Sequence, residues 1–239
     1  RLMHVAIIGL GPSAGAFFDL AKRLGGASAY CDQVWGINAM GDVLRCDIVF
    51  HMDDMRVQEA RAEANPTGNI AAMVKWLQTY PGRVMTSVSR YPTHEAFPLA
   101  DILNASHESG AVPYFNSTAA YAVAYAIHVG ATQISLFGID YTLPNRHEAE
   151  QGRACVEYWL GVAAAKGIVI TVPDQSSLLD ACQTDRDRLY GYDCVDVTFR
   201  EGSGPMEVIM TDRPEPVDAA EIERRYDHNK HPNPLMQGT

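Results

Sequence analysis

Apolar and polar positions alternate along residues 1–182 in two different ways. Short apolar runs that end at a glycine or a polar residue are typical of buried β-strands. They lie at His4–Gly9, Gln33–Ile37, Asp47–His51, Arg83–Ser87, Gln133–Phe137 and Gly167–Val172. Between them, apolar residues recur at helical spacing. These segments are Ser13–Leu24, Met55–Ala64, Asn69–Tyr80, Ser117–Val129, His147–Lys166 and Ser176–Cys182.

Strands that alternate with helices predict one fold class, a doubly wound, mostly parallel, Rossmann-like α/β sheet. In such sheets ligands bind beyond the carboxyl ends of the strands. The residues that directly follow each predicted strand are therefore the first candidates for a functional site.

Two segments depart from this pattern. Residues 88–115 are mixed in character and contain several prolines, which suggests an insertion or a lid. Residues 183–239 are charged and proline-containing, with hairpin strands expected at Val195–Phe199 and Met206–Met210. We therefore expect a nucleotide-binding domain over residues 1–182 and a small C-terminal appendage with a tail over residues 183–239.

Composition narrows the class of protein further. The chain has 239 residues, of which 47% are hydrophobic and 20% charged, which is typical of a globular protein. A net charge of −10 argues against a general nucleic-acid or anionic-membrane surface. Five scattered cysteines without a CxxC pair indicate free thiols in a reducing compartment. With no apolar run near the ~20 residues of a membrane span and no signal peptide, we expect a cytoplasmic protein.

The turn after the first predicted strand fits a phosphate-binding pattern. Residues 9–14 read GLGPSA, which matches the dinucleotide fingerprint GxGxx(G/A), in which glycines and a helix N-terminus meet a pyrophosphate. An NAD or FAD site also needs an acidic residue after the second strand, where this sequence has Asn38. The turn is not a Walker loop, because no Gly-Lys-Ser/Thr follows it. A tight turn without a ligand is a further alternative.

The sequence also resembles a known family. The stretch "IIGLGPS" is similar to the "GNGPS" motif of bacterial sialyltransferases that use CMP-sialic acid. Archaeal-type 6-hydroxymethylpterin pyrophosphokinases and flagellin-glycosylation factors share this motif. Three further elements match in order: Asn38 after the second strand, "FHMDD" after the third, and Ser117-Thr118 before an alanine-rich helix that leads to "LFGIDYT". Together they span residues 4–142, with 88–115 unmatched.

The resemblance implies a nucleotide-binding fold and also shows departures. Leu10 stands where the sialyltransferases carry an asparagine that contacts the nucleotide. Thr142 stands where they carry a phosphate-binding tyrosine, and Tyr141 comes one place earlier. In that family the acid that corresponds to Asp140 shapes the nucleotide site, and a structural hydrogen bond to a neighbouring loop is the alternative.

The candidate nucleotide-binding residues follow from both arguments. Backbone N–H groups of residues 11–13 are expected to meet a phosphate, Asn38 to contact the ribose or base, and the helix-capping pair after residue 116 to bind an anion or ribose. The full set is Gly9, Gly11, Pro12, Ser13, Asn38, Ser117, Thr118, Gly138, Asp140 and Tyr141.

The candidate catalytic residues lie in two loops. His147 follows the last matched block and suits a general base, with Arg146 beside it to neutralise a leaving phosphate. His51, after the third strand, is the rival base. The adjacent carboxylates of Asp53 and Asp54 could hold Mg²⁺ beside a diphosphate, or form a solvated helix start.

These residues favour a transferase that moves a glycosyl group from a nucleotide sugar, CMP- or UDP-linked, to a hydroxyl acceptor. A Mg²⁺-dependent diphosphotransferase of the pterin pyrophosphokinase type and a non-catalytic nucleotide-binding protein are the alternatives. The net charge favours a glycan or a small molecule as the acceptor over modified DNA. The sequence leaves the oligomeric state open.

Overall fold

The computed structural model describes residues 2–107, 110–141, 146–183, 188–192, 194–200, 204, 206–214, 218, 220 and 223. The chain divides into two compact units, residues 1–179 and 180–239. The boundary lies three residues before the one expected from the sequence.

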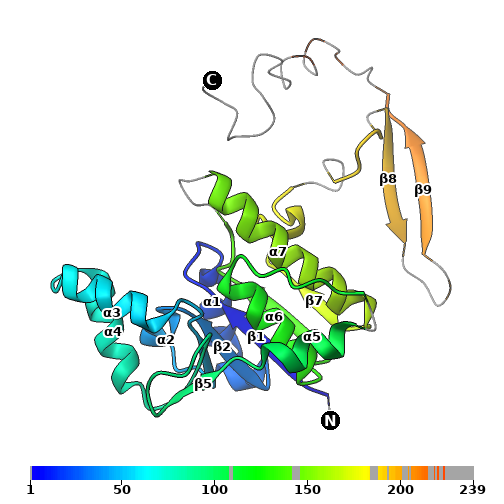
Figure 1. The fold of residues 1–239 in the computed structure, drawn as a ribbon. Coiled ribbons are helices and arrows are strands. Elements are labelled where there is room, and N and C mark those ends of the chain that lie inside the picture. Colours follow the sequence, from blue (N-terminus) through cyan, green and yellow to red (C-terminus); the bar gives the residue numbers. More distant parts are fainter. Residues whose placement is uncertain are drawn as a thin grey trace. The chain divides into compact units, whose positions relative to one another are not determined.

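The first unit is built on a parallel sheet (Figure 1). Among the described residues this sheet has seven strands in the order β5-β4-β3-β2-β1-β6-β7, and each neighbouring pair is parallel. Its strands are β1 (His4–Ile8), β2 (Gln33–Ile37), β3 (Ile48–Phe50), β4 (Arg83–Thr86), β5 (His94–Ala96), β6 (Gln133–Phe137) and β7 (Val169–Thr171). The predicted doubly wound α/β fold is confirmed.

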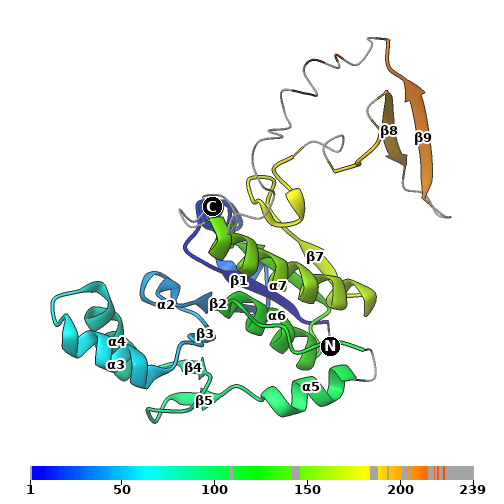
Figure 2. The ribbon, with the colours of Figure 1, turned by 45° about the horizontal axis from the view of Figure 1, so that its top comes forward.

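Helices cover both faces of this sheet, with α6 and α7 on one face and α1 on the other (Figures 1 and 2). The α-helices are α1 (Ala14–Leu24), α2 (Met40–Val43), α3 (Met55–Ala64), α4 (Asn69–Thr79), α5 (Leu99–His107), α6 (Thr118–His128) and α7 (Arg146–Ala165). Two short 3-10 helices are η1 (Ala27–Ala29) and η2 (Leu178–Asp180).

Alternating side chains of the strands build two cores. In β1, Val5 and Ile7 point into the cluster shared with α6 and α7, whereas Ala6 and Ile8 point into the cluster shared with α1. This follows from the two-residue period of a strand, and it explains why the strands read as continuous apolar runs. Every residue from 5 to 8 is buried.

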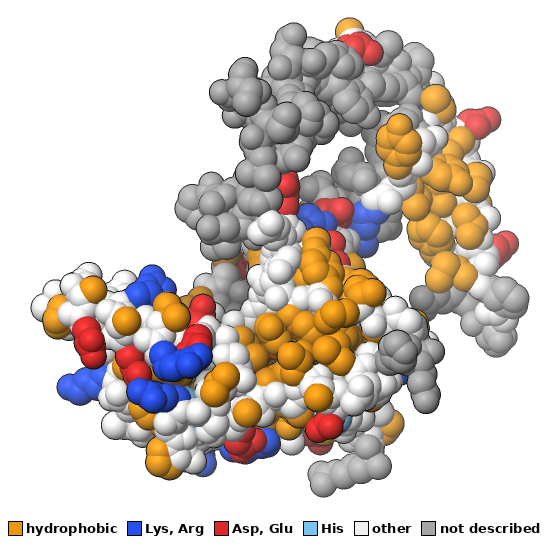
Figure 3. Space-filling model, in the orientation of Figure 1, with side chains coloured by type: hydrophobic (Ala, Val, Ile, Leu, Met, Phe, Trp, Pro, Cys, Tyr) orange, Lys and Arg blue, Asp and Glu red, His pale blue; other side chains and the backbone are white. Residues whose placement is uncertain are grey.

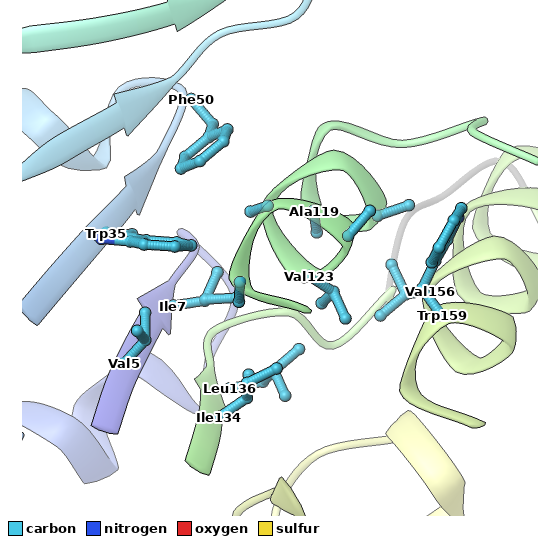
Figure 4. Packing of buried hydrophobic residues seen from close by; sticks show 14 of the residues in the cluster. Val5, Ile7, Trp35, Phe50, Ala119, Val123, Ile134, Leu136, Val156 and Trp159 are labelled. Atoms are coloured by element: carbon cyan, nitrogen blue, oxygen red, sulfur yellow. The ribbon is translucent and has the colours of Figure 1, made fainter. Parts of the chain in front are cut away.

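The alanine-rich sequence of α6 has a packing role. Ala119 and Val123 of α6 lie between the strand side chains and Trp159 of α7 (Figure 4). Because alanine side chains are small, α6 can lie close to the sheet while α7 packs on its outer side. The helix predicted from the sequence therefore forms the middle layer of this core.

Residues 88–115, expected to be an insertion or a lid, contribute secondary structure to the first unit. They contain β5, the edge strand of the sheet, and α5. Arg83 of β4 forms two hydrogen bonds of 2.8 Å to the carboxylate of Glu95 in β5. The strand is three residues long and two of its side chains are exposed, so no apolar run marks it in the sequence.

The second unit contains an antiparallel hairpin of β8 (Val195–Arg200) and β9 (Glu207–Asp212). Both strands overlap the expected ones. The pairing places Val197 opposite Met210 and Phe199 opposite Val208, so these side chains share one face. Apolar side chains are accordingly exposed on this hairpin (Figure 3).

Within the part of the chain that the structure describes, none of the helices combines the length and the apolar character that crossing a membrane requires.

Candidate functional site

A cleft of about 380 Å³ opens at the carboxyl ends of the central strands. It lies where the chain order of the sheet reverses, between β1 and β6, because β2 continues on one side of β1 and β6 pairs with the other. This switch point is the usual ligand site of a doubly wound sheet. The described residues that line it are Gly9, Leu10, Gly11, Pro12, Ile37, Ser117, Ala119, Gly138, Ile139, Asp140 and Tyr141.

The structure thus brings together seven of the ten residues proposed from the sequence to bind a nucleotide. Ser13, Asn38 and Thr118 are not among the lining residues. Sequence reasoning did not select the apolar walls of the cleft, which are Leu10, Ile37, Ala119 and Ile139. The only signal for them is that each neighbours a selected residue. Leu10 is 60% exposed, so it offers the cleft an apolar surface.

Glycines form the floor of the cleft because two backbones meet there. A side chain on Gly9 would collide with the carbonyl oxygen of Gly138, and one on Gly138 would collide with the carbonyl oxygen of Gly9. A Cβ on Gly11 would lie 2.6 Å from Oδ2 of Asp140. These glycines are therefore needed for contacts within the protein, whether or not a phosphate approaches them.

Asp140 fastens the glycine turn to the end of β6. Its Oδ2 accepts from the backbone N–H of Ser13 (2.7 Å), and its Oδ1 accepts from the Ser13 hydroxyl (2.6 Å). The same hydroxyl oxygen accepts from the N–H of Gly138 (2.7 Å). Asp140 is only 3% exposed. A carboxylate thus stands at the N-terminus of α1, which is the place a bound anion would take.

The N–H groups of residues 11 and 13, which were predicted to meet a phosphate, have partners within this network. The N–H of Gly11 donates to the Gly138 carbonyl (2.7 Å), that of Ser13 donates to Asp140, and Pro12 has none. The donors at the start of α1 are therefore used within the protein.

The N-terminus of α6 differs from that of α1. Ser117 occupies the N-cap position, but its side chain makes no capping hydrogen bond. Its Oγ instead lies 2.5 Å from the hydroxyl of Tyr141. Within the described part of the chain, the N–H groups of Thr118 and Ala119 have no hydrogen-bond partner, as expected for the first turn of a helix. Ser117, one of the two predicted capping residues, is thus the N-cap of α6. Its side chain contacts Tyr141 at the cleft instead of capping the helix.

Tyr141 is held in an unusual conformation at the cleft. Its φ is 47°, in the left-handed region, which is uncommon for a side chain of this size. Gly152 of α7 makes room for the ring, since a Cβ there would collide with Tyr141. Burial raises the pKa of Tyr141 above its usual range, and the phenol O–H can donate a hydrogen bond.

Asn38 and His51 form a pair beside the cleft. Asn38 follows Ile37 at the end of β2 with a φ of 52°, and its N–H donates to the Phe50 carbonyl (2.8 Å). Its Oδ1 lies 3.0 Å from Nδ1 of His51. The His51 side chain is 1% exposed. A general base must reach its substrate, so this burial does not favour His51 as the base, and that role stays a prediction.

The two carboxylates after β3 have different neighbours: Asp53 Oδ2 lies 3.9 Å from Nε2 of His51, whereas Asp54 contacts Arg56. Asp54 is the N-cap of α3, where it accepts from the N–H of Arg56 (2.9 Å) and pairs with the Arg56 guanidinium. This engagement of Asp54 agrees with the helix-start alternative. Figure 3 shows charged side chains of both signs over this part of the molecule. No group of three or more His, Cys, Asp or Glu that could hold a metal occurs among the residues that the structure describes.

The remaining catalytic candidates stand at the start of α7. Arg146 and His147 belong to the first turn of this helix, whose bounds match the predicted ones closely. Their side chains, and all of Thr142, lie outside the described residues. The proposed roles of His147 as base and Arg146 as phosphate partner therefore stay predictions.

Two buried histidines should make stability depend on pH. Burial lowers the pKa of both His51 and His94; Asp53 opposes the shift at His51 and His94 adds to it. Below about pH 6.5 the unfolded chain therefore binds more protons than the folded protein does. The free energy of unfolding should consequently fall on acidification, by up to about 1.4 kcal/mol per pH unit for each histidine. Urea unfolding at pH 7.5, 6.5 and 5.5 measures this slope.

A matched pair of variants tests whether His94 contributes to this pH dependence of the free energy of unfolding. His94→Gln should reduce it, whereas His128→Gln, at an exposed position, should leave it unchanged. Equal slopes in both variants and the wild-type protein would contradict the assignment.

No protein-family model and no curated protein sequence matches this chain. Among solved structures, the chain is similar to the sialyltransferase CstII from Campylobacter jejuni in complex with cytidine-5′-monophosphate, at 16% identity and a TM-score of 0.45, covering 74% of this chain and 82% of that one. It is also similar to CstII in complex with CMP-3FNeuAc, at 16% identity and a TM-score of 0.46, covering 74% and 84%. A complex of CST-II with a trisaccharide acceptor and CMP gives 17% identity and a TM-score of 0.44, covering 73% and 83%.

Proposed function

We propose that this protein is a nucleotide-sugar-dependent transferase that moves a glycosyl group to a hydroxyl acceptor. The observation that carries the proposal is the cleft at the switch point of the sheet, which brings the glycine turn, the N-terminus of α6 and Tyr141 together. A nucleotide needs an apolar surface for its base and hydrogen-bond donors for its phosphate. The cleft offers both in one place.

The phosphate is proposed to bind at α6 rather than at the glycine turn. The N–H groups of Gly11 and Ser13, in the turn before α1, bond Gly138 and Asp140, whereas those of Thr118 and Ala119 have no partner among the residues that the structure describes. The helix dipole of α6 favours an anion there, and the hydroxyls of Ser117 and Tyr141 lie beside it. The glycine floor then supplies shape, and Leu10 and Ile37 supply the apolar walls.

The chemistry proposed is direct displacement. The acceptor hydroxyl attacks the glycosyl carbon, the bond from that carbon to the phosphate oxygen breaks, and the nucleotide leaves with the bonding electrons. A base must take the hydroxyl proton. His147, which lies in the first turn of α7 and six residues after Tyr141 in the sequence, is the proposed base.

A magnesium-dependent diphosphotransferase is the less favoured reading. It depended on Asp53 and Asp54 acting together, and Asp54 is engaged as the cap of α3 and in an ion pair with Arg56. A non-catalytic nucleotide-binding protein shares the proposed cleft and differs only in turnover.

The proposal is tested by incubating the protein with CMP-, UDP- and GDP-sugars and measuring released nucleotide, with and without EDTA. Release of nucleotide in EDTA supports the transferase. Conversion of ATP to AMP that requires Mg²⁺ would overturn it in favour of the diphosphotransferase, and tight nucleotide binding without turnover would overturn it in favour of a binding protein.

Tyr141→Phe should weaken nucleotide binding by about 10- to 100-fold, because a hydrogen bond to a charged group contributes about 1.5–3 kcal/mol. Isothermal titration calorimetry with the nucleotide that binds best measures the change. Tyr30→Phe is the matched control, since the Tyr30 hydroxyl also bonds a serine, Ser135 Oγ at 2.9 Å, outside the cleft. If both variants bind as the wild-type protein does, Tyr141 does not contact the nucleotide.

A further inference from the structure

The carboxamide of Asn38 uses only its oxygen in a hydrogen bond to the residues that the structure describes. Its oxygen, Oδ1, faces Nδ1 of His51 at 3.0 Å. Its nitrogen, Nδ2, forms no hydrogen bond to any residue that the structure describes, and the side chain is partly exposed. The preceding residue, Ile37, lines the cleft. Asn38 therefore has two unused N–H donors at the edge of the candidate site.

The contact between Oδ1 of Asn38 and Nδ1 of His51 leaves the NH₂ group of Asn38 available to a ligand. A carboxamide oxygen can only accept, so the imidazole donates from Nδ1 and its Nε2 carries a lone pair. That Nε2 is buried and without a hydrogen-bond partner among the described residues; the nearest charged group is Asp53, whose Oδ2 is 3.9 Å away. The imidazole thus leaves one polar atom unsatisfied while its other nitrogen holds the amide of Asn38.

The backbone at Asn38 is also fixed. Its left-handed φ of 52° is one that asparagine tolerates better than most residues, and its N–H is tied to the carbonyl of Phe50. In this arrangement the Nδ1–H of His51 faces Oδ1, so the NH₂ group of Asn38 is directed away from the imidazole.

We propose that His51 is a positioning residue that orients the amide of Asn38, so that its NH₂ group donates to an acceptor atom of the nucleotide bound in the cleft. The acceptor class is a ribose hydroxyl oxygen or a carbonyl oxygen of a pyrimidine base. This inference rests on the proposed nucleotide site and gives the buried histidine a role other than proton transfer. Burial lowers the pKa of His51, which keeps the imidazole neutral, and Nδ1 donates in either protonation state.

A double-mutant cycle with cytidine 5′-monophosphate as the probe tests the proposal at pH 7.5. His51→Leu should weaken CMP binding about tenfold, the equivalent of one lost hydrogen bond. His51→Asn should bind within about threefold of the wild-type protein, because its amide NH₂ can replace the Nδ1 donor. In an Asn38→Ala background, His51→Leu should have no further effect, because the two residues act as one unit.

The outcomes separate this inference from the proposed function. If the wild-type protein binds neither CMP nor the other nucleoside monophosphates, the nucleotide site itself is wrong, and the inference falls with it. If it binds CMP and His51→Leu weakens binding equally with and without Asn38, His51 acts only through the stability of the fold and the proposal is overturned. His51→Asn binding no better than His51→Leu would overturn it as well.

A second variant serves if His51→Leu does not fold. Asn38→Asp keeps an oxygen that accepts from His51 but removes the NH₂ donors. Its affinity for CMP should fall by about tenfold or more. An unchanged affinity in this variant would overturn the proposal, because no donor would then be needed at this position.

Discussion

Asp140→Ala is expected to lower the free energy of unfolding by about 2–5 kcal/mol. The carboxylate accepts from both the N–H and the hydroxyl of Ser13, and all of these groups are buried. Removing it leaves two buried donors without a partner, at a cost of about 1–3 kcal/mol each. The favourable interaction of a negative charge with the N-terminus of α1 is lost as well. Urea denaturation monitored by circular dichroism measures the change.

Two comparisons sharpen this prediction. Asp19→Ala removes an exposed carboxylate from the same helix and should change stability by no more than about 0.5 kcal/mol. Asp140→Asn keeps one acceptor oxygen and should lie between the two. Equal denaturation midpoints for Asp140→Ala and Asp19→Ala would show that the network around Ser13 contributes nothing.

Gly138→Ala is expected to destabilise the protein by about 3 kcal/mol or more. The residue has a φ of 67°, a conformation that costs a side chain about 1–2 kcal/mol. The new Cβ would also collide with the carbonyl of Gly9, and crowding of a packed interior costs about 1–3 kcal/mol. Since Gly138 joins β6 to the cleft, nucleotide binding should weaken in the same variant. Urea denaturation gives the first effect, and calorimetric titration gives the second.

The matched control for this substitution is Gly15→Ala, in the first turn of α1. Nothing lies within 4 Å of its Cβ position, so the alanine meets open space. Because alanine favours a helix over glycine by about 1 kcal/mol, this variant should be unchanged or more stable. A Gly138→Ala protein as stable as Gly15→Ala would mean that the strand ends do not approach as closely as described.

Gly138→Ala also bears on two explanations of the glycine motif, because its Cβ would meet the carbonyl of Gly9. The sequence pattern suggested that glycines admit a phosphate. In the structure, Gly9 and Gly11 are required by the close approach of Gly138 and Asp140, which follow the neighbouring strand β6. Loss of stability without any ligand supports the internal requirement. Loss of nucleotide binding at full stability would instead support the phosphate cradle.

Most of the sheet could be predicted because its signals are local. A strand buried on both faces is apolar throughout, and an amphipathic helix repeats every three to four residues. The ranges Gln33–Ile37, Gln133–Phe137 and Met55–Ala64 agree with the structure to the residue. Strand β5 and helix α2 were missed because each is short and neither has the continuous apolar run that marks the equally short strand β3.

The choice of residues around the cleft was also accessible from the sequence, once the strands were known. Parallel strands bring their carboxyl ends to one edge, so the residues after β1 and β6 had to meet there. This placed Gly11, Gly138 and Tyr141 together, as the structure has them. It could not assign partners to the polar groups among them.

Those partners depend on the tertiary structure, because they join residues far apart in the chain. Ser13 and Asp140 are 127 positions apart, and their hydrogen bonds require the register in which Ile8 of β1 pairs with Phe137 of β6. His51 follows a strand as a ligand-facing residue would, yet packing of the neighbouring elements buries it against Asn38. The amino-acid sequence determined the order of strands and helices and the edge at which a site forms, since these follow from local periodicity. Only the packing of the strands decided which donors at that edge are used within the protein and which are left for a ligand.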